Sequence, residues 1–219
     1  MSKKMMVLAL GVVSAAFFAL PTMAFAETLH LSATTTFSIA SSATTNLTTT
    51  EGPSISCTST TGSGTFSTTT GGSMSLLIHG CTSVFLACTS AGQSSGTVAA
   101  SFSFDLITVS AGSAGILLTP SSSEEITGQK VFSEFSCSGV TIHTFGKGLI
   151  GTLSSTLCSG SVSTATVSFA SSSAGHQNDK TYTGNTFDLS SDLTASHPTF
   201  SFDGTASLTL GAARTVTCT

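Results

Sequence analysis

The sequence predicts an all-β protein, an antiparallel sandwich or barrel of many short strands that is stapled by disulfides. Three observations support this fold class. Apolar and polar residues alternate with period two in several segments, as in strands with one buried face. Clusters of turn residues separate these segments at intervals of about 8–12 residues, which is typical of sandwiches and barrels. Finally, six cysteines follow an N-terminal segment that resembles an export signal.

The N-terminal segment has the parts of a secretory signal peptide. Lys3 and Lys4 supply positive charge, residues 7–20 form an uninterrupted run of apolar and small residues, and residues 24–26 supply the small-x-small cleavage pattern. The apolar run is shorter than the ~20 residues of a membrane-spanning helix. We therefore expect cleavage after Ala26, a secreted or cell-surface location, and no membrane span in the mature chain.

The mature chain of 193 residues (219 less 26) is long enough for one domain with a real core. We assign residues 27–50 to a Thr- and Ser-rich segment, either an edge strand or a leader, and residues 51–219 to a single β domain. Four basic and ten acidic residues remain after signal removal, which gives a net charge of −6. Because the basic residues are scattered, the chain lacks the clustered cationic face that nucleic acids or anionic lipid surfaces require.

Alternation is clearest in residues 199–210, where apolar or small side chains share one parity and polar side chains the other. Val216 and Cys218 keep the apolar parity, so we expect the C-terminus to continue or re-enter the sheet. The same pattern predicts strands within residues 29–39, 74–78, 101–110 and 164–170. Residues 124–126 fit one short turn of helix. A parallel β-helix is the rival architecture, but it needs a regular repeat that the chain does not show.

One hairpin is predicted in detail. Residues 140–145 and 148–153 flank Gly146 and Lys147. With Lys147 and Gly148 as a two-residue turn, Gly148 would take the positive φ that such turns require. The resulting register places Cys137 opposite Cys158.

The cysteines of the mature chain predict disulfides, because an even number in an exported protein is typical of a disulfide framework. They are Cys57, Cys81, Cys88, Cys137, Cys158 and Cys218. The chain has no C-x-x-C pair, the spacing that zinc knuckles and redox-active dithiols use. The histidines do not form a ligand motif either, and His30, His79 and His143 are predicted to be solvent-facing strand residues. We expect no metal site, no cofactor and no catalytic residue.

Six short motifs carry a resemblance to known sequences. They are ISCTSTTGSGTF, LIHGCT, ACTSAGQSSGTV, GILLTP, FSEFSC and GLIGTL, within about residues 55–155. Together they resemble a group of hypothetical exported proteins of actinobacteria and related soil bacteria. The resemblance implies export and a β-rich fold, and carries no activity to transfer.

The same resemblance groups the cysteines. Cys57, Cys81, Cys88 and Cys137 fall on its pattern, and two cysteines outside a four-cysteine framework would most simply pair with each other. That conflicts with the hairpin register, which favours Cys137–Cys158. From the resemblance we predict the bonds Cys81–Cys88, Cys57–Cys137 and Cys158–Cys218.

Polar side chains are densest between residues 175 and 188. The candidate ligand residues there are His176, Asn178, Asp179, Tyr182, Asn185 and Asp188. Amides and carboxylates hydrogen-bond sugar hydroxyls, and Tyr182 offers a stacking face, but a solvated hairpin loop fits the same residues. Residues 92–96 match G-x-S-x-G, yet the helix that a nucleophile elbow needs does not follow.

An apolar tip, Val84-Phe85-Leu86, lies between Cys81 and Cys88. It either folds over one end of the core or forms an exposed contact surface. These features together favour an exported, non-enzymatic structural or surface-interaction protein, whose candidate partners are a glycan or another envelope protein. A carbohydrate-binding module is the alternative, weakened by the absence of tryptophan, and a secreted hydrolase ranks third.

Overall fold

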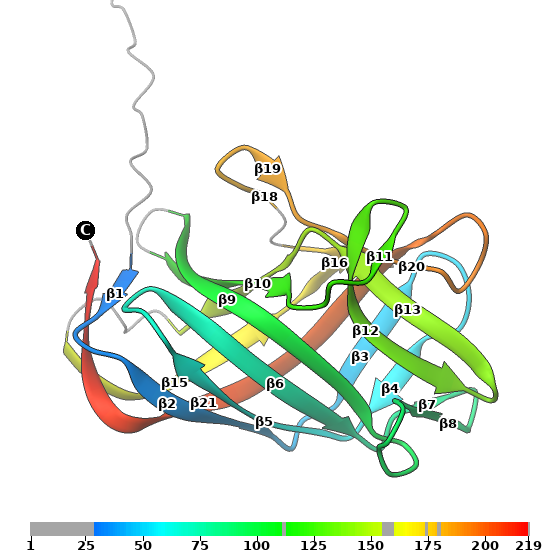
Figure 1. The fold of residues 1–219 in the computed structure, drawn as a ribbon, viewed down its shortest axis with the longest axis horizontal. Helices are drawn as coiled ribbons and strands as arrows, with labels where there is room; N and C mark the ends of the chain where they lie inside the picture. The colour runs from blue at the N-terminus through cyan, green and yellow to red at the C-terminus, as the bar shows by residue number, and fades with distance from the viewer. Residues whose placement is uncertain (1–28, 111–112, 155–159, 174, 179–180, 219) are drawn as a thin grey trace, which may run out of the picture.

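The protein is an all-β molecule built around an eight-stranded antiparallel barrel with additional strands, as predicted (Figure 1). The structure is a computed structural model, and it describes residues 29–110, 113–154, 160–173, 175–178 and 181–218. The predicted signal peptide, residues 1–26, lies outside the described residues. Within the described part of the chain, no helix has the length and apolar character needed to cross a bilayer.

Eight strands close the barrel through pairings that are all antiparallel. In order around the barrel they are β2 (Thr35–Ser41), β5 (Ser59–Phe66), β6 (Gly71–His79), β9 (Val98–Ser110), β10 (Ser113–Pro120), β14 (Leu149–Leu153), β15 (Gly160–Phe169) and β21 (Thr199–Cys218), which pairs again with β2. A short strand, β1 (Leu29–Leu31), pairs with the end of β21. Antiparallel pairing throughout is not the arrangement of a parallel β-helix.

A second closed circuit of pairings adjoins the barrel. Its members are β3 (Thr45–Thr49), β4 (Ile55–Cys57), β7 (Thr82–Ser83), β8 (Leu86–Thr89), β12 (Gln129–Cys137), β13 (Val140–Gly146), β20 (Leu189–Ser191) and the first residues of β21. Five further short strands form three hairpins: β11 (Glu125–Ile126) with β12, β16 (Ser171–Ser173) with β17 (His176–Gln177), and β18 (Thr181–Tyr182) with β19 (Asn185–Thr186). The short helical turn predicted at residues 124–126 is wrong, because β11 pairs with β12 there.

The last strand joins the two circuits. Residues 200–203 of β21 pair with β3 and residues 204–209 pair with β15, and the strand runs along the whole molecule (Figure 1). The predicted parity is confirmed, since Phe200, Leu208, Leu210 and Val216 are buried. Ser201, on the opposite parity, is also buried, because this part of the strand is covered on both faces.

Side chains of the predicted strands fill the barrel. The apolar residues of the alternating segments are buried: Leu29, Leu31, Phe37, Ile39, Met74, Leu76, Ile78, Phe102, Phe104, Ala165, Val167 and Phe169. Phe37, Phe66 and Phe104 form an aromatic cluster whose ring centroids lie 4.8–5.5 Å apart, a separation typical of favourable aromatic pairs. Two cavities of about 30 Å³ each remain among these apolar side chains. A cavity of that size holds about one water molecule, so the barrel interior is a packed core.

Residues 27–50 contribute central strands. β2 lies between β5 and β21, and β3 lies between β4 and β21, whereas the short β1 pairs with β21 at one edge. Phe37, Ile39 and Leu47 point into the core, and Thr45 and Thr49, which share the parity of Leu47, are buried as well. In spite of the Thr-rich composition, buried residues alternate with more exposed ones along β2 and β3.

The hairpin predicted across Lys147 and Gly148 is wrong. β13 pairs with β12 and β20, whereas β14 pairs with β10 and β15, so the chain crosses from the second circuit to the barrel at this point. The two glycines are needed for close approach. A Cβ on Gly146 would lie 2.5 Å from the carbonyl oxygen of Asp188, and one on Gly148 would lie 2.8 Å from the Phe187 ring. At these two positions glycine therefore allows close packing of neighbouring segments, and it does not indicate a hairpin turn.

Two disulfides correct the predicted pairing. Cys57 bonds to Cys81 and Cys88 bonds to Cys137, with Cα atoms 4.0 and 4.2 Å apart. The chain does fold back between Cys81 and Cys88, and the amide of Cys88 donates to the Cys81 carbonyl at 2.9 Å. Cys81 is thus bonded to the end of β4, and Cys88 to the end of β12. Cys158 lies outside the described residues and the side chain of Cys218 is not described, so the Cys158–Cys218 bond stays a prediction.

Candidate interaction site

The hairpin β7–β8 is held on both of its flanks. Cys81, just before β7, is bonded to Cys57 at the end of β4, and Cys88 in β8 is bonded to its register partner Cys137 in β12. Both sulfur pairs are fixed between strands that also share ladder hydrogen bonds. The hairpin is therefore a rigid projection, and it lies at the same end of the molecule as the β12–β13 turn (Figure 1).

Between the two disulfides the apolar side chains of the tip point into solvent. Phe85 is 98% exposed, Val84 67% and Leu86 49%. With Val140, which is 56% exposed, they are the large hydrophobic side chains that the described residues leave exposed. Val140 follows the β12–β13 turn and pairs with Cys137, which also pairs with Cys88, so Val140 lies two strands from Cys88, or about 10 Å at ordinary strand spacing. The four side chains thus gather at one end of the second circuit.

The backbone at the tip has an unfavourable conformation. Ser83 pairs with Leu86, which leaves Val84 and Phe85 as a two-residue turn, with φ of 48° and 71°. Positive φ at both central residues defines the type I′ hairpin turn, which prefers Asn-Gly or Asp-Gly. A β-branched or bulky residue in this region is a conformational outlier, at a cost of about 1–2 kcal/mol per residue.

The rest of the molecule offers a direct comparison. Three other two-residue hairpins in the described ranges have positive φ at both turn residues: Thr127-Gly128, Ser138-Gly139 and Thr183-Gly184. Each carries glycine at the second position. Only the tip, among these four turns, has two apolar side chains there. The turn that lacks glycine is thus the one whose apolar side chains are most exposed.

The sequence on either side of the tip carries no formal charge. The sequence has no Asp, Glu, Lys or Arg between Glu51 and Asp105, a stretch that includes β4 to β8 and most of β9. Thr82, Ser138 and Thr141, which are near these apolar residues in sequence, are exposed. The sequence around the apolar residues is therefore uncharged and carries exposed hydroxyls.

The predicted ligand loop forms part of the barrel's cover. Tyr182, the only tyrosine of the chain, and Phe187 pack against Ile107, Leu117 and Ile150 on the outer face of the barrel. His176 Nδ1 lies 3.4 Å from Asp188 Oδ2, and the backbone amide of Asn178 donates to Ala170. Asn185 is exposed in the β18–β19 hairpin. Asp179 lies outside the described residues. The structure thus brings His176 and Asp188 together and places the Tyr182 ring against the barrel.

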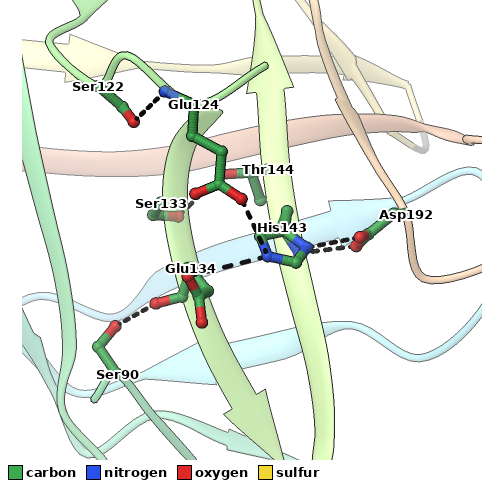
Figure 2. Close-up of polar contacts among 8 residues, drawn as sticks. All are labelled: Ser90, Ser122, Glu124, Ser133, Glu134, His143, Thr144 and Asp192. Carbon is green, nitrogen blue, oxygen red and sulfur yellow. Dashed lines mark hydrogen bonds and ion pairs between the residues drawn. The ribbon is translucent and has the colours of Figure 1, made fainter. Parts of the chain in front are cut away.

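A histidine cluster that the sequence did not predict lies on the second circuit (Figure 2). Asp192, after β20, accepts hydrogen bonds from the His143 backbone amide at 2.7 Å and from its Nδ1 at 2.6 Å. On the other side of the ring, Nε2 lies 3.8 Å from Glu134 and 4.0 Å from Glu124. Because a carboxylate only accepts, Nδ1 carries a proton, and in the neutral ring Nε2 has the lone pair. His143 was expected to face solvent, but it is largely buried by these neighbours.

The geometry of this cluster fits a structural role. A catalytic Asp-His pair needs a nucleophile beside Nε2, but the neighbouring hydroxyls have other partners: Ser90 donates to the Glu134 carbonyl at 2.6 Å, and Ser133 bonds to Thr144 at 2.8 Å. Over the described ranges, no three His, Cys, Asp or Glu side chains converge tightly enough to hold a metal ion. The Asp192 side chain instead continues the β13–β20 ladder by one residue. Asp192 is 49 residues from His143 in sequence, so no local pattern signals the pair.

Residues 92–96 form turns between β8 and β9, and no helix follows them. The sequence-based interpretation of G-x-S-x-G as a loop agrees with this position. Comparisons with models of protein families, with curated proteins and with solved structures find no match to this chain.

Proposed function

We propose that this is an exported, non-enzymatic surface-interaction protein whose contact surface is the tip Val84-Phe85-Leu86. The observation that carries the proposal is the tip's combination of exposure and strain. Phe85 is almost wholly exposed and both turn residues have positive φ. Strain of this kind persists where the surroundings enforce it, and it clusters at ligand-contact sites. An exposed apolar side chain held in this way adds nothing to the folded core.

The rigidity of the hairpin supports the same proposal. A contact surface binds more tightly when it does not lose conformational freedom on binding, and two disulfides and the flanking strands hold this hairpin in place. The packing of Tyr182 against the barrel favours the tip over a carbohydrate-binding loop at residues 175–188.

A cell-sedimentation assay tests the proposal. The purified, oxidised mature protein is mixed with washed cells of the exporting strain from which its gene has been deleted, and the bound fraction is measured. The double variant Val84→Asn, Phe85→Gly keeps the turn type and removes the apolar surface. The matched control, Thr127→Asn, alters a turn of the same type on the β11–β12 hairpin.

We expect wild type and the Thr127→Asn control to bind alike. The affinity of the tip variant for the cells should be lower by about tenfold or more, because full burial of a side chain such as Phe contributes roughly 1.5–3 kcal/mol. Equal binding by the tip variant and wild type would contradict the proposal.

A further inference from the structure

The chemistry around the tip indicates what it contacts. We propose that Val84, Phe85 and Leu86 insert into the surface of a zwitterionic lipid bilayer. This inference rests on the proposed function, because it names the partner of the same site.

The apolar surface is too small for a stable protein interface. A specific interface buries about 800 Å² on each partner and uses about 20–30 residues a side. The tip offers three apolar side chains and Val140 nearby, and even a fully buried aromatic side chain contributes only about 150–250 Å². A second copy of the chain meeting tip to tip would bury no more. A bilayer requires no matched surface, so a small protruding apolar point is sufficient.

The charge around the tip selects the kind of lipid. The stretch between Glu51 and Asp105 has no charged side chain, and the mature chain carries a net charge of −6. An anionic membrane attracts clustered Lys and Arg residues, and this chain presents none there. Thr82, Ser138 and Thr141, near the apolar residues in sequence, are exposed, and hydroxyls of this kind can hydrogen-bond to headgroup oxygens. A neutral, zwitterionic surface fits this arrangement.

The base of the hairpin is paired on both sides. β7 pairs with β4 at Thr82, and β8 pairs with β12 at Cys88 and Thr89. Backbone polar groups that approach hydrocarbon must be hydrogen-bonded within the protein, and next to the turn Ser83 and Leu86 pair with each other. The outer edge that an extended peptide could use to add a strand is thus confined to the residues beside the turn. The hairpin therefore suits a bilayer surface better than a peptide partner.

Binding is expected to be weak and reversible. A single myristoyl chain gives a membrane association constant of about 10⁴ M⁻¹, and three side chains at a tip bury less hydrocarbon than that chain. The test therefore uses phosphatidylcholine vesicles at millimolar lipid. The bound fraction is measured by flotation of wild type, Val84→Asn/Phe85→Gly and Thr127→Asn, with and without added salt. A second vesicle set contains anionic lipid.

Wild type and Thr127→Asn should float with phosphatidylcholine vesicles, to the same extent at low and high salt, and no better when anionic lipid is added. The tip variant should lose about ten- to a hundredfold in partition coefficient. Three outcomes would overturn the lipid assignment: no flotation of wild type, flotation that needs anionic lipid and fails in salt, or equal flotation of the tip variant.

The two proposals fail separately. If wild type does not float but its binding to cells still depends on the tip, the tip contacts a partner other than lipid, and only the lipid assignment is lost. If binding to cells is also independent of the tip, the proposed function itself is lost.

Discussion

At the residue scale, the molecule gives up stability at two turn positions. Val84 and Phe85 have positive φ without the glycine that the other type I′ turns of the described chain carry. Neither side chain packs against the protein to offset this, because both are exposed. The conformational preference of Val and Phe thus conflicts with the backbone conformation of this turn, and natural proteins tend to show such conflicts at functional sites.

Replacing Val84-Phe85 by Asn-Gly should therefore stabilise the protein. We expect the free energy of unfolding to rise by about 1–3 kcal/mol, because Asn and Gly adopt positive φ readily and no buried contact is lost. Denaturant unfolding of the oxidised protein measures the change. The control Ser138→Asn, in a turn that already carries Gly139, should stay within about 0.5 kcal/mol of wild type. A destabilised tip variant would show that the tip packs onto the protein.

The His143–Asp192 pair gives a second prediction at this scale. Asp192→Ala leaves the His143 amide and Nδ1 without their acceptor in a largely buried position. The loss should destabilise the protein by about 1–3 kcal/mol in denaturant unfolding. Glu134→Gln, which alters a half-exposed contact of the same ring, should change stability by less than about 1 kcal/mol. Equal effects of the two variants would contradict the assignment of Asp192 as the structural partner.

At the element scale, the hairpin β7–β8 is positioned by disulfides to its two neighbours. Cys57–Cys81 spans 24 residues and Cys88–Cys137 spans 49. Closing loops of these lengths restricts the unfolded chain by about 3–4 kcal/mol for each bond in the chain-entropy model. Each bond also fixes one flank of the projection that carries the tip.

Replacing both cysteines of one bond by serine should lower the free energy of unfolding by about 3–4 kcal/mol. The pairs to compare are Cys57/Cys81 and Cys88/Cys137, with wild type under the same oxidising conditions as reference. Non-reducing peptide mapping checks the pairing itself. A peptide linked through Cys81 and Cys88 would contradict the structure and support the pairing first predicted from the sequence.

Elements with one buried face could be predicted from the sequence, and connections between them could not. Alternation located the strand cores around Phe37, Phe104 and Leu208, because a strand with one buried face has period two. The same alternation cannot tell which strands become neighbours. The link at Lys147 looks like a hairpin turn by its glycines, yet those glycines allow close packing as the chain changes sheet. Likewise, the tip was located by its apolar residues, but its direction depended on a turn that its sequence disfavours.

At the scale of the whole molecule, two closed circuits share β21 and leave little room inside. The cavities of about 30 Å³ are far smaller than a small-molecule ligand site, which is usually about 300–1,000 Å³. Packed interior phenylalanines supply stability, and the exposed Phe85 does not. Function in this fold is therefore expected on the outside, where a rigid frame holds a small apolar point.

The same substitution at two phenylalanines tests this division. Phe104→Ala removes a fully buried ring that contacts Phe37 and Phe66, and we expect a loss of about 3–5 kcal/mol in the free energy of unfolding. Phe85→Ala removes an exposed ring and should change stability by less than about 0.5 kcal/mol. Similar losses at both positions would mean that Phe85 belongs to the core.

The most direct test of the account is the fluorescence of a Phe85→Trp variant. The chain has no other tryptophan, so the emission reports on the tip alone. We predict a solvent-exposed spectrum that acrylamide quenches freely in buffer, followed by a blue shift and protection from quenching when the protein binds the cells that export it. A spectrum already shifted to the blue in buffer, or one unchanged on cell binding, would contradict the claim that Phe85 is an outward-facing contact residue.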